Sequence, residues 1–596
     1  MLDIEKELDG IMEKYGMGYE VCYKESLKSV ICEIIQKAVQ QYGKKIIVRG
    51  LKKSNLGKYP ILSLLEEQAE VVGVVDLHPF DNIVRFEGKH GLKEVPFVEN
   101  GVKIEKKSCD IYIINTLYQG KNIYYEVKDE LQAKGIGVID LYKMIRTNYS
   151  LAPSKLYDEY DKERDFSYNL IWHEVNVFRK YKNQESLEKL LSVCLYLRDF
   201  VSFFRYVEEG KDIVNRTKKI QELVKEIQNF LGKVKRQIEI RERSLKQKDI
   251  IVHWIDQLSY GELFMLPKLS KRIQNALFFE NSYTVTPYTR PTARMMFWKE
   301  FRGITDEHSK KVNGEYEEKS LEDSTLYQKI RHSDYNFQVC GYVKKILEKE
   351  AAGLEMCEFS VASTVHYFQM INKIINASKP IFGIVHILNE THEPYVSPES
   401  GLENKSFEFQ NAYAESKEKI EASAAYADEL IDFYTELIGN NSVGIYMSDH
   451  GKWEDIDRRR YQDTAMHTIL GITNIGLRGR VERTFSYQCF EELVEWVLKL
   501  AAPEEMFFND LPIYSEGFKA AIRERTQEVE EIYSGYKGVN TSQDKYVRLD
   551  NGQEFYFLKS ENELENHVFD LTYEERVNEL RQRCNELEGN LYKNIK

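Results

Sequence analysis

Two apolar segments in the C-terminal half of the chain end in residues that could bind a metal ion. DIIVHWIDQLS carries Asp256 at the end of its apolar run, and SVGIYMSDHG ends in Asp449 and His450. A carboxylate at the carboxyl end of a buried parallel strand lies where open α/β sheets bind their ligands. Adjacent buried ionisable groups are costly unless they are paired or bound to metal. We therefore predict that Asp256, Asp449 and His450 bind a metal ion.

A hydroxyl group lies between these two segments in the chain. Thr289 belongs to the segment TPYTRPT, two residues before Pro291 and just ahead of a helix-like run. Free backbone N–H groups and the helix dipole at a helix N-terminus stabilise both an attacking alkoxide and an anionic ester. We predict that Thr289 is the nucleophile and a fourth metal ligand. The alternatives are Thr292 as nucleophile, or a role of the hydroxyl as a simple helix cap.

Two further side chains could contact an anionic substrate. Arg290 follows the predicted nucleophile directly, and Arg294 is the alternative on the same helical turn. His467, in DTAMHTILGI, precedes another apparent strand and could face the same site. We predict that Arg290 and His467 bind substrate.

Four segments, in this order, resemble the alkaline phosphatase and sulfatase superfamily over about residues 248–590. They are the strand-end acid, the segment LPKLS to FFENSY with the following threonine and proline, the HEPY element, and the SDHG element. The resemblance implies an alkaline-phosphatase-like α/β/α sandwich with a small C-terminal subdomain from about residue 535. It also implies that His392 contacts the anionic group of the substrate. A loop histidine bonded to backbone is the alternative for His392.

Departures from the family patterns indicate a subclass. Sulfatases carry C-x-P-S-R or S-x-P-x-R, the source of formylglycine, and threonine at position 289 cannot be converted to that residue. The D-x-x-G-H element of the two-metal enzymes is absent after His392, which favours a single metal. A threonine nucleophile with one metal resembles the phosphoethanolamine and phosphoglycerol transferases. Trp254 stands where lipoteichoic acid synthases have a substrate-binding histidine, which disfavours phosphoglycerol recognition.

These features predict a metal-dependent hydrolase or transferase of phosphoryl-type esters. Two carboxylates, one imidazole and one hydroxyl suit one divalent ion, either Mn²⁺, Mg²⁺, Zn²⁺ or Ca²⁺. The substrate would be a phosphodiester or phosphomonoester of a sugar, glycan or lipid precursor, and a Thr289 ester would pass to water or to an alcohol. A sulfatase-like hydrolase and a non-catalytic binding protein stay open as alternatives.

The first 150 residues favour a Rossmann-like α/β domain. Four short β-branched runs alternate with helical stretches, which is typical of a parallel sheet: 46–48, 71–75, 111–114 and 136–139. Asp76 follows the second run, where dinucleotide-binding folds place an acid that binds a ribose hydroxyl. The phosphate loop has only Gly50 and Gly57 in RGLKKSNLG, which disfavours intact dinucleotide binding. A degenerate module that binds a partner, a sugar or nothing is the alternative.

The remaining organisation follows from length and periodicity. The 596 residues exceed one ordinary hydrophobic core, so several domains are expected. Residues 151–247 carry apolar positions at spacings of three and four and are expected to form a helical linker or domain. Residues 248–596 are the expected catalytic domain.

Composition and charge limit the partners and the location. Hydrophobic residues make up 42% and charged residues 30%, the balance of a folded protein. The net charge of −13 and the absence of a basic block exclude nucleic acid as the expected partner. No run of about 18 apolar residues is found, so no membrane span is predicted. The sequence favours a cytoplasmic protein and leaves the oligomeric state open.

Overall fold

The computed structural model describes most of the chain, with gaps. The described residues are 3–17, 23–50, 60–75, 83–98, 104–115, 120–149, 169–299, 321–341, 343, 347, 362–388, 390–392, 395, 397–398, 417–439, 441–452, 463–499, 513–517, 536–541, 543–549, 552–559 and 565–593.

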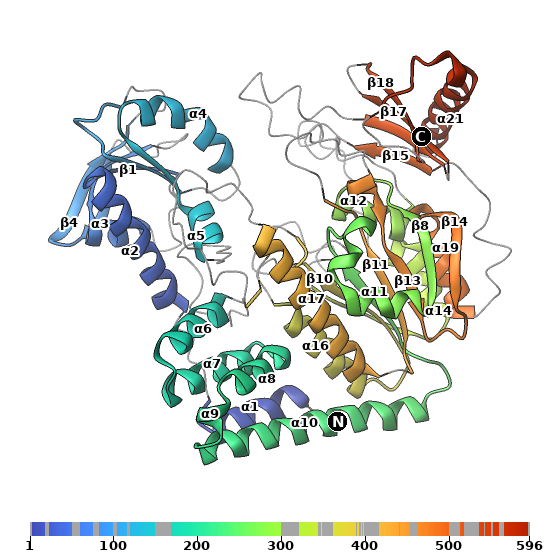
Figure 1. The fold of residues 1–596 in the computed structure, drawn as a ribbon, viewed down its shortest axis with the longest axis horizontal. Coiled ribbons are helices and arrows are strands. Elements are labelled where there is room, and N and C mark those ends of the chain that lie inside the picture. Colours follow the sequence, from blue (N-terminus) through green and yellow to red (C-terminus); the bar gives the residue numbers. More distant parts are fainter. Residues whose placement is uncertain are drawn as a thin grey trace.

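A four-stranded parallel sheet forms the centre of the N-terminal unit (Figure 1). Its strands, in the order β2-β1-β5-β6, are β1 (Lys45–Arg49), β2 (Glu70–Val75), β5 (Ile111–Ile114) and β6 (Gly137–Asp140). The helices of this unit are α2 (Tyr23–Tyr42), α3 (Pro60–Gln68), α4 (Gly120–Ala133) and α5 (Leu141–Tyr149), and a hairpin joins β3 (Ile83–Gly88) to β4 (Gly91–Pro96). All strand pairs of the sheet are parallel, as the alternation of apolar runs and helices predicts. Its Rossmann-like character beyond this pairing stays a prediction, and Asp76 and Gly57 lie outside the described residues.

Helices form the connection between the two sheets. They are α1 (Ile4–Lys14), α6 (Asn169–Tyr181), α7 (Gln184–Tyr196), α8 (Phe200–Glu209), α9 (Lys211–Val214) and α10 (Lys218–Ser244). The buried positions of α10 recur at spacings of three and four, so the helix buries one stripe: Ile220, Leu223, Ile227, Phe230, Val234 and Ile238. In Figure 1 this helix lies along the lower edge, where it packs on α1 and on helices of the C-terminal half.

An eight-stranded sheet forms the centre of the C-terminal half. Its strands are β7 (Ile250–Ile255), β8 (Leu277–Tyr283), β9 (Asn336–Cys340), β10 (Ile381–Ile387), β11 (Val443–Ser448), β12 (His467–Thr468), β13 (Leu470–Thr473) and β14 (Gly479–Ser486). The order is β12-β8-β13-β11-β7-β10-β9, with β14 paired to β8. The central strands β9, β10, β7 and β11 are parallel, and β13 runs antiparallel to β11.

Helices cover both faces of this sheet. Alternate residues of β7 enter different cores: Ile251 and Ile255 pack in one, and Val252 and Trp254 in the other. The helices of the first face are α11 (Pro267–Gln274), α16 (Ser363–Asn376) and α17 (Lys417–Ile438), and those of the second are α12 (Thr289–Trp298), α14 (Thr325–His332) and α19 (Phe490–Lys499). The architecture is therefore an α/β/α sandwich, as predicted.

A small antiparallel sheet and the last helix complete the chain. They comprise β15 (Ile513–Gly517), β16 (Tyr536–Asn540), β17 (Asp544–Leu549), β18 (Glu554–Leu558) and α21 (Glu574–Lys593). Their core includes Val285 and Met295, which lie on either side of Thr289 in the sequence. The C-terminal unit therefore supports the segment that carries the predicted nucleophile.

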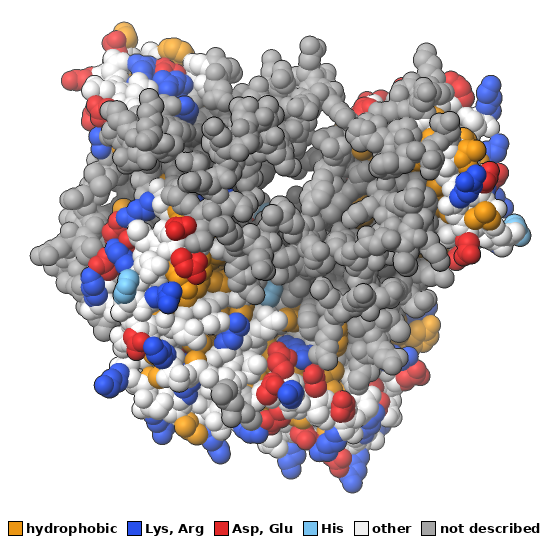
Figure 2. Space-filling model, turned by 180° about the vertical axis from the view of Figure 1, so that it is seen from behind, with side chains coloured by type: hydrophobic (Ala, Val, Ile, Leu, Met, Phe, Trp, Pro, Cys, Tyr) orange, Lys and Arg blue, Asp and Glu red, His pale blue; other side chains and the backbone are white. Residues whose placement is uncertain are grey.

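None of the described helices is both long and apolar enough to cross a membrane. Figure 2 shows basic and acidic side chains interspersed over the described part of one face.

Candidate metal centre and active site

The carboxyl ends of two adjacent strands bring the predicted metal ligands together. β7 and β11 pair in parallel, with Ile255 opposite Ser448. The residues that follow, Asp256 on one strand and Asp449 and His450 on the other, therefore lie side by side. All three are at most 2% exposed.

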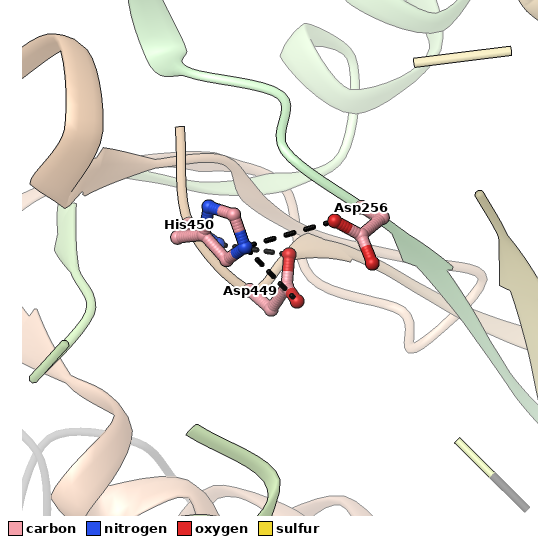
Figure 3. A group of neighbouring side chains, drawn as sticks. All are labelled: Asp256, Asp449 and His450. Atoms are coloured by element: carbon pink, nitrogen blue, oxygen red, sulfur yellow. Dashed lines mark hydrogen bonds and ion pairs between the residues drawn. The ribbon is translucent and has the colours of Figure 1, made fainter. Parts of the chain in front are cut away.

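One atom of each of these three side chains faces the others (Figure 3). The Nε2 of His450 lies 3.7 Å from Oδ1 of Asp256 and 3.8 Å from Oδ2 of Asp449. The Nδ1–H of His450 donates a hydrogen bond to the carbonyl oxygen of Gly451, at 2.8 Å. The lone pair of the neutral ring is therefore on Nε2, which is the arrangement of a metal-binding imidazole.

Two carboxylate oxygens of this group lack a hydrogen bond. Oδ1 of Asp256 and Oδ2 of Asp449 are buried and accept none from the described residues. Ligand atoms of the three residues lie within 4.8 Å of one another, which is close enough for a single ion to contact all of them. Buried carboxylate oxygens without a donor are costly unless a cation compensates them. The residues present therefore fit one divalent cation.

The other oxygen of each carboxylate is held by hydrogen bonds. Oδ2 of Asp256 accepts from the Thr289 hydroxyl and from Nε2 of His386, both at 3.1 Å. Oδ1 of Asp449 accepts from the backbone N–H groups of Gln257, at 3.2 Å, and of His450, at 2.9 Å. These bonds orient both carboxylates, and the remaining oxygen of each lies near Nε2 of His450.

The two carboxyl groups differ in their electrostatic surroundings. Burial raises the pKa of Asp449, and the neighbouring charge of Asp256 raises it further. Burial also acts to raise the pKa of Asp256, but the charge of His392 and the hydrogen bond from His386 outweigh it and lower that pKa. The clustered histidines thus favour an ionised Asp256.

Two residues beside the site have special requirements, Gln257 for its backbone angle and Gly451 for its lack of a side chain. Gln257 has φ +57°, in the left-handed region, and this turn directs its N–H at Asp449. Gly451 closes the motif where no side chain fits, because an added Cβ would lie 2.0 Å from the carbonyl oxygen of Thr464 and 2.7 Å from Cβ of Ser259. The glycine of the SDHG segment is therefore required by packing.

Thr289 is the first residue of α12 and contacts the ligand group. Its Oγ1 lies 3.1 Å from Oδ2 of Asp256 and 3.4 Å from Nε2 of His450. The cap residue of α12 is Tyr288, which forms no side-chain cap bond. Thr292, the alternative nucleophile, is fully buried, and its hydroxyl bonds to the hydroxyl of Thr284 at 3.1 Å. Of the two threonines, Thr289 is the one whose hydroxyl lies within hydrogen-bonding distance of the predicted metal ligands Asp256 and His450 among the described residues.

The histidine of the HEPY segment also lies near this group. His392 is half-buried, and its charge contributes to the lowered pKa of Asp256. Its backbone N–H donates to the carbonyl oxygen of Leu388, at 2.8 Å. Its role in binding substrate stays a prediction.

His386 also contacts Asp256, although the sequence did not predict it as a site residue. This residue lies in the apolar run of β10, which reads as a core strand, yet its Nε2 contacts Asp256. It pairs with Trp254 across β10 and β7, and its ring meets the Trp254 indole edge-on with ring centres 6.1 Å apart. A histidine inside an apolar strand is unusual and could have marked His386 as a candidate. Its contact with Asp256, however, depends on the register between β10 and β7, which are far apart in the sequence.

His253 and His467 are held by aromatic neighbours. The ring of His253 stacks on Tyr446 with centres 4.3 Å apart, and its Nδ1 bonds to the hydroxyl of Tyr367 at 2.7 Å. The ring of His467 stacks against Tyr260, and its Nε2–H donates to the carbonyl oxygen of Glu280, at 2.8 Å. This nitrogen of His467 is therefore already bonded to backbone.

The substrate-binding roles predicted for two further residues, Arg290 and His467, differ in what the structure describes. The side chain of Arg290 lies outside the described part of the chain, whereas Arg294 is described and half-buried on α12. The substrate-binding roles of Arg290 and His467 stay predictions.

No protein-family model matches the chain, and no curated protein matches it. Solved structures do match. A putative sulfatase from Bacteroides thetaiotaomicron is 14% identical with a TM-score of 0.43, over 59% of this chain and 95% of that chain. A phosphonate monoester hydrolase of Agrobacterium radiobacter is 12% identical with a TM-score of 0.41, over 58% of this chain and 96% of that chain.

A third structure was solved in complex with its substrate D-glucosamine-2-N,6-O-disulfate. It is 14% identical with a TM-score of 0.41, over 59% of this chain and 99% of that chain. Identities and TM-scores this low transfer no residue role and no substrate. The chain is similar to sulfatases and phosphonate monoester hydrolases, which are members of the alkaline phosphatase and sulfatase superfamily.

Proposed function

We propose that this protein is a metal-dependent hydrolase or transferase of phosphoryl-type esters that works through a covalent Thr289 intermediate. The observation that carries the proposal is the position of Thr289 Oγ1, 3.1 Å from Asp256 and 3.4 Å from His450, at the first residue of α12. The substrate class is a phosphodiester or phosphomonoester of a sugar, glycan or lipid precursor.

The donor set suits one hard or borderline divalent cation, either Mn²⁺, Mg²⁺, Zn²⁺ or Ca²⁺. Asp256, Asp449, His450 and Thr289 would hold it. Bound there, the cation would lower the pKa of the Thr289 hydroxyl and offset negative charge on the transferring group.

The protein's own groups direct the threonine oxygen. The Thr289 hydroxyl donates its hydrogen to Oδ2 of Asp256, which leaves the oxygen lone pairs for the phosphorus of the ester. In the first step the bond from Oγ1 to phosphorus forms, the hydroxyl proton passes to Oδ2 of Asp256, and the bond to the leaving oxygen breaks, with that oxygen taking up a proton from water. In the second step the oxygen of water or of an alcohol bonds to the same phosphorus and gives up its proton to water, while the bond from phosphorus to Oγ1 breaks and Oγ1 takes its proton back from Asp256.

The start of α12 stabilises the negative charge of both steps. The first N–H groups of a helix have no acceptor within it, and they bind anions together with the helix dipole. Tyr288, the cap residue, leaves them uncapped. In this proposal His392, Arg290 and His467 bind the anionic group of the substrate.

The test compares hydrolysis of bis-nitrophenyl phosphate, nitrophenyl phosphate and nitrophenyl sulfate, with Mn²⁺ added and with chelator, alongside the metal content of the purified protein. We expect metal-dependent turnover of a phosphate ester that falls by at least about a thousandfold in Thr289→Ala, since the nucleophile is removed. Thr325→Ala is the matched control. Thr325 also begins a helix, but its hydroxyl bonds to Glu491, and its replacement should leave turnover unchanged.

The other outcomes are equally informative. Faster turnover of the sulfate ester than of both phosphate esters would make the protein a sulfuric ester hydrolase. Metal-free and inactive protein would leave a binding protein with this fold. A covalent phosphoryl group on the peptide that contains Thr289, detected by mass spectrometry after rapid acid quenching, would identify the nucleophile, and a phosphorylated acceptor formed with added ethanolamine would identify a transferase.

A further inference from the structure

We propose that the N-terminal α/β unit has a second ligand site, at Arg49 and Asn115, which binds the anionic group of a small molecule. The anionic group is a phosphate or a carboxylate, next to a hydroxyl or amino group of the same ligand. This site lies in a different sheet from the metal centre, and the proposal does not depend on the proposed function.

The two residues lie where the strand order of the parallel sheet reverses. The chain passes from β1 to β2 on one side, and then to β5 and β6 on the other side of β1. Open α/β sheets bind ligands in the crevice at the carboxyl ends of their strands at such a point. Arg49 is the last residue of β1 and pairs with Ile114, the last residue of β5, which Asn115 follows.

Arg49 is a buried cation with an unused donor. It is 4% exposed, and its Nη2 donates no hydrogen bond to any described residue. Its ion pair is with Glu126 of α4, where Nη1 lies 3.6 Å from a carboxylate whose side chain is 42% exposed. A guanidinium offers five N–H donors, and burying one of them without an acceptor is costly. An anion that accepts from Nη2 would compensate this charge.

The buried hydroxyl of Tyr112 lies beside Arg49 and responds to its positive charge. Tyr112 precedes the end of β5 and shares the α4 face with Arg49. Burial raises the pKa of its hydroxyl, and the charge of Arg49 and a hydrogen bond with the Arg49 side chain oppose that rise, so Tyr112 is a partner of Arg49 that leaves Nη2 unused.

Asn115 adds a fixed acceptor at the same edge. Its backbone N–H donates to the carbonyl oxygen of Arg49 at 2.8 Å, and its Nδ2 donates to the carbonyl oxygen of Gly50 at 3.0 Å. Gly50 has φ +85°, a geometry that glycine adopts without strain, so the chain turns directly after Arg49. These bonds hold the amide of Asn115, and its buried Oδ1 accepts no hydrogen bond from the described residues.

The combination defines the ligand by its chemistry. Nη2 of Arg49 requires an anionic oxygen, and Oδ1 of Asn115 requires a donor such as a hydroxyl. A sugar phosphate, a nucleotide and a hydroxy acid share these features. Both atoms are enclosed in this structure, so a ligand reaches them after side chains at this edge shift.

The test is calorimetric titration of the full chain with three probes: ADP, glucose 6-phosphate and malate. A chelator is present so that the metal centre does not contribute. We expect at least one probe to bind, and Arg49→Met to weaken that binding at least about tenfold, because a charged hydrogen bond is lost. Arg85→Gln is the matched control, since Arg85 is an exposed arginine of the β3–β4 hairpin, paired with Glu94, and its loss should leave binding unchanged.

Arg49→Lys covers the case in which Arg49→Met does not fold, since it keeps the charge and loses the planar pair of donors. We expect it to weaken binding several-fold. Tighter binding of ADP or glucose 6-phosphate than of malate assigns a phosphate site, and the reverse assigns a carboxylate site. The proposal is wrong if no probe binds the wild-type protein, or if the folded Arg49 variants bind the probes as tightly as the wild type does.

Discussion

At the scale of single residues, the metal centre depends on which oxygen of each carboxylate stays available. Asp256 presents Oδ1 to His450 because its Oδ2 is occupied by Thr289 and His386. Groups that orient a metal ligand typically change metal affinity 10- to 100-fold when they are removed. In the proposed metal centre, His386 is such a positioning residue, because its Nε2 lies 3.1 Å from Oδ2 of Asp256.

We therefore predict that His386→Ala lowers metal affinity by about 10- to 100-fold, because the Asp256 carboxylate loses a bond that orients it. His386→Gln should restore part of this affinity, since its side-chain amide can donate to Asp256. Competition with a metal indicator measures both variants, and thermal unfolding with chelator shows whether they fold. His366→Gln is the control, a buried histidine whose Nδ1 bonds to the carbonyl oxygen of His386 and not to Asp256. Equal metal affinity of His386→Ala and wild type would contradict the prediction.

The residue scale also separates what the sequence could predict from what it could not. Asp256, Asp449 and His450 each follow an apolar run, so strand-end position alone predicts that they lie at one edge. His386 is equally close to the site but lies inside its strand, and only the register between β10 and β7 brings it to Asp256. Register between strands 130 residues apart is a property of tertiary packing.

At the scale of elements, adjacent residues of strand β7 point to opposite faces of the sheet. His253 of β7 points to the face of α16, where Tyr446 and Tyr367 enclose it, whereas Trp254 belongs to the opposite core. Burial lowers the pKa of His253 to about 3 and that of His366, on α16, to about 4. Both rings are therefore neutral in the folded protein at mildly acidic pH.

We predict that stability falls as the pH falls below 6.5. The unfolded chain binds protons at these histidines near pH 6.5, and the folded protein does so only near pH 3 to 4, so stability is full above 6.5 and is lost as the pH decreases. Between pH 7.5 and 5.5 each histidine should contribute a loss of about 1.4 kcal/mol in the free energy of unfolding. Urea unfolding at the two pH values measures the loss.

His253→Phe isolates one of these contributions. Phenylalanine keeps a ring beside Tyr446 and cannot titrate, so the pH dependence should become smaller. The exposed His332 supplies the control substitution, His332→Phe. An unchanged pH dependence in His253→Phe would show that folding does not lower the pKa of His253.

Part of the secondary structure was predictable. Apolar β-branched runs predicted the four parallel strands of the N-terminal sheet and the strands β7 and β11, and period-3.6 patterns predicted helices within residues 151–247, whereas the parallel strand β9 and the β3–β4 hairpin were not predicted. The antiparallel and mixed pairing of β8 with β12, β13 and β14 was not predicted, because β12 has only two residues and β14 is polar along much of its length. Such pairing depends on neighbours in the sheet more than on local pattern.

At the scale of the whole molecule, one core runs through regions that the sequence analysis treated as separate. Ile46 of the N-terminal sheet, Leu191 of α7 and Ile251 of β7 belong to a single continuous cluster of buried residues. The boundaries of the predicted domains stay predictions. Periodicity shows which face of a helix is buried but not which partner covers it, so this continuity could not be inferred from the sequence.

An ion-pair network joins α10 to the start of the C-terminal sheet. Arg241 is 8% exposed, and its guanidinium donates to both carboxylate oxygens of Asp249, which precedes β7. The same guanidinium donates to the carbonyl oxygens of Ala377, at 2.9 Å, and Lys379, at 2.7 Å, which precede β10. Asp249 in turn accepts from the N–H of Ile381.

We predict that Arg241→Ala lowers the free energy of unfolding by about 3 kcal/mol, since it leaves a buried carboxylate without its partner. Arg243→Ala, two residues further along the same helix and exposed, should change it by less than about 0.5 kcal/mol. Urea unfolding of the two variants compares them directly. Similar midpoints for both variants would mean that the buried pair adds no net stability.

The position of β7 at the centre of the sheet has a consequence for synthesis of the chain. Its neighbours on both sides are translated later: His386 follows Asp256 by 130 residues, and Asp449 follows Gln257 by 192. At roughly 5–20 residues per second, a ribosome needs on the order of 10–40 s to deliver the second neighbour. For the first 130 residues of this interval β7, whose six residues are all buried in the finished sheet, has no strand beside it, and one of its edges stays unpaired until β11 has been made. The nascent chain therefore exposes an aggregation-prone strand until its last partner has left the ribosome.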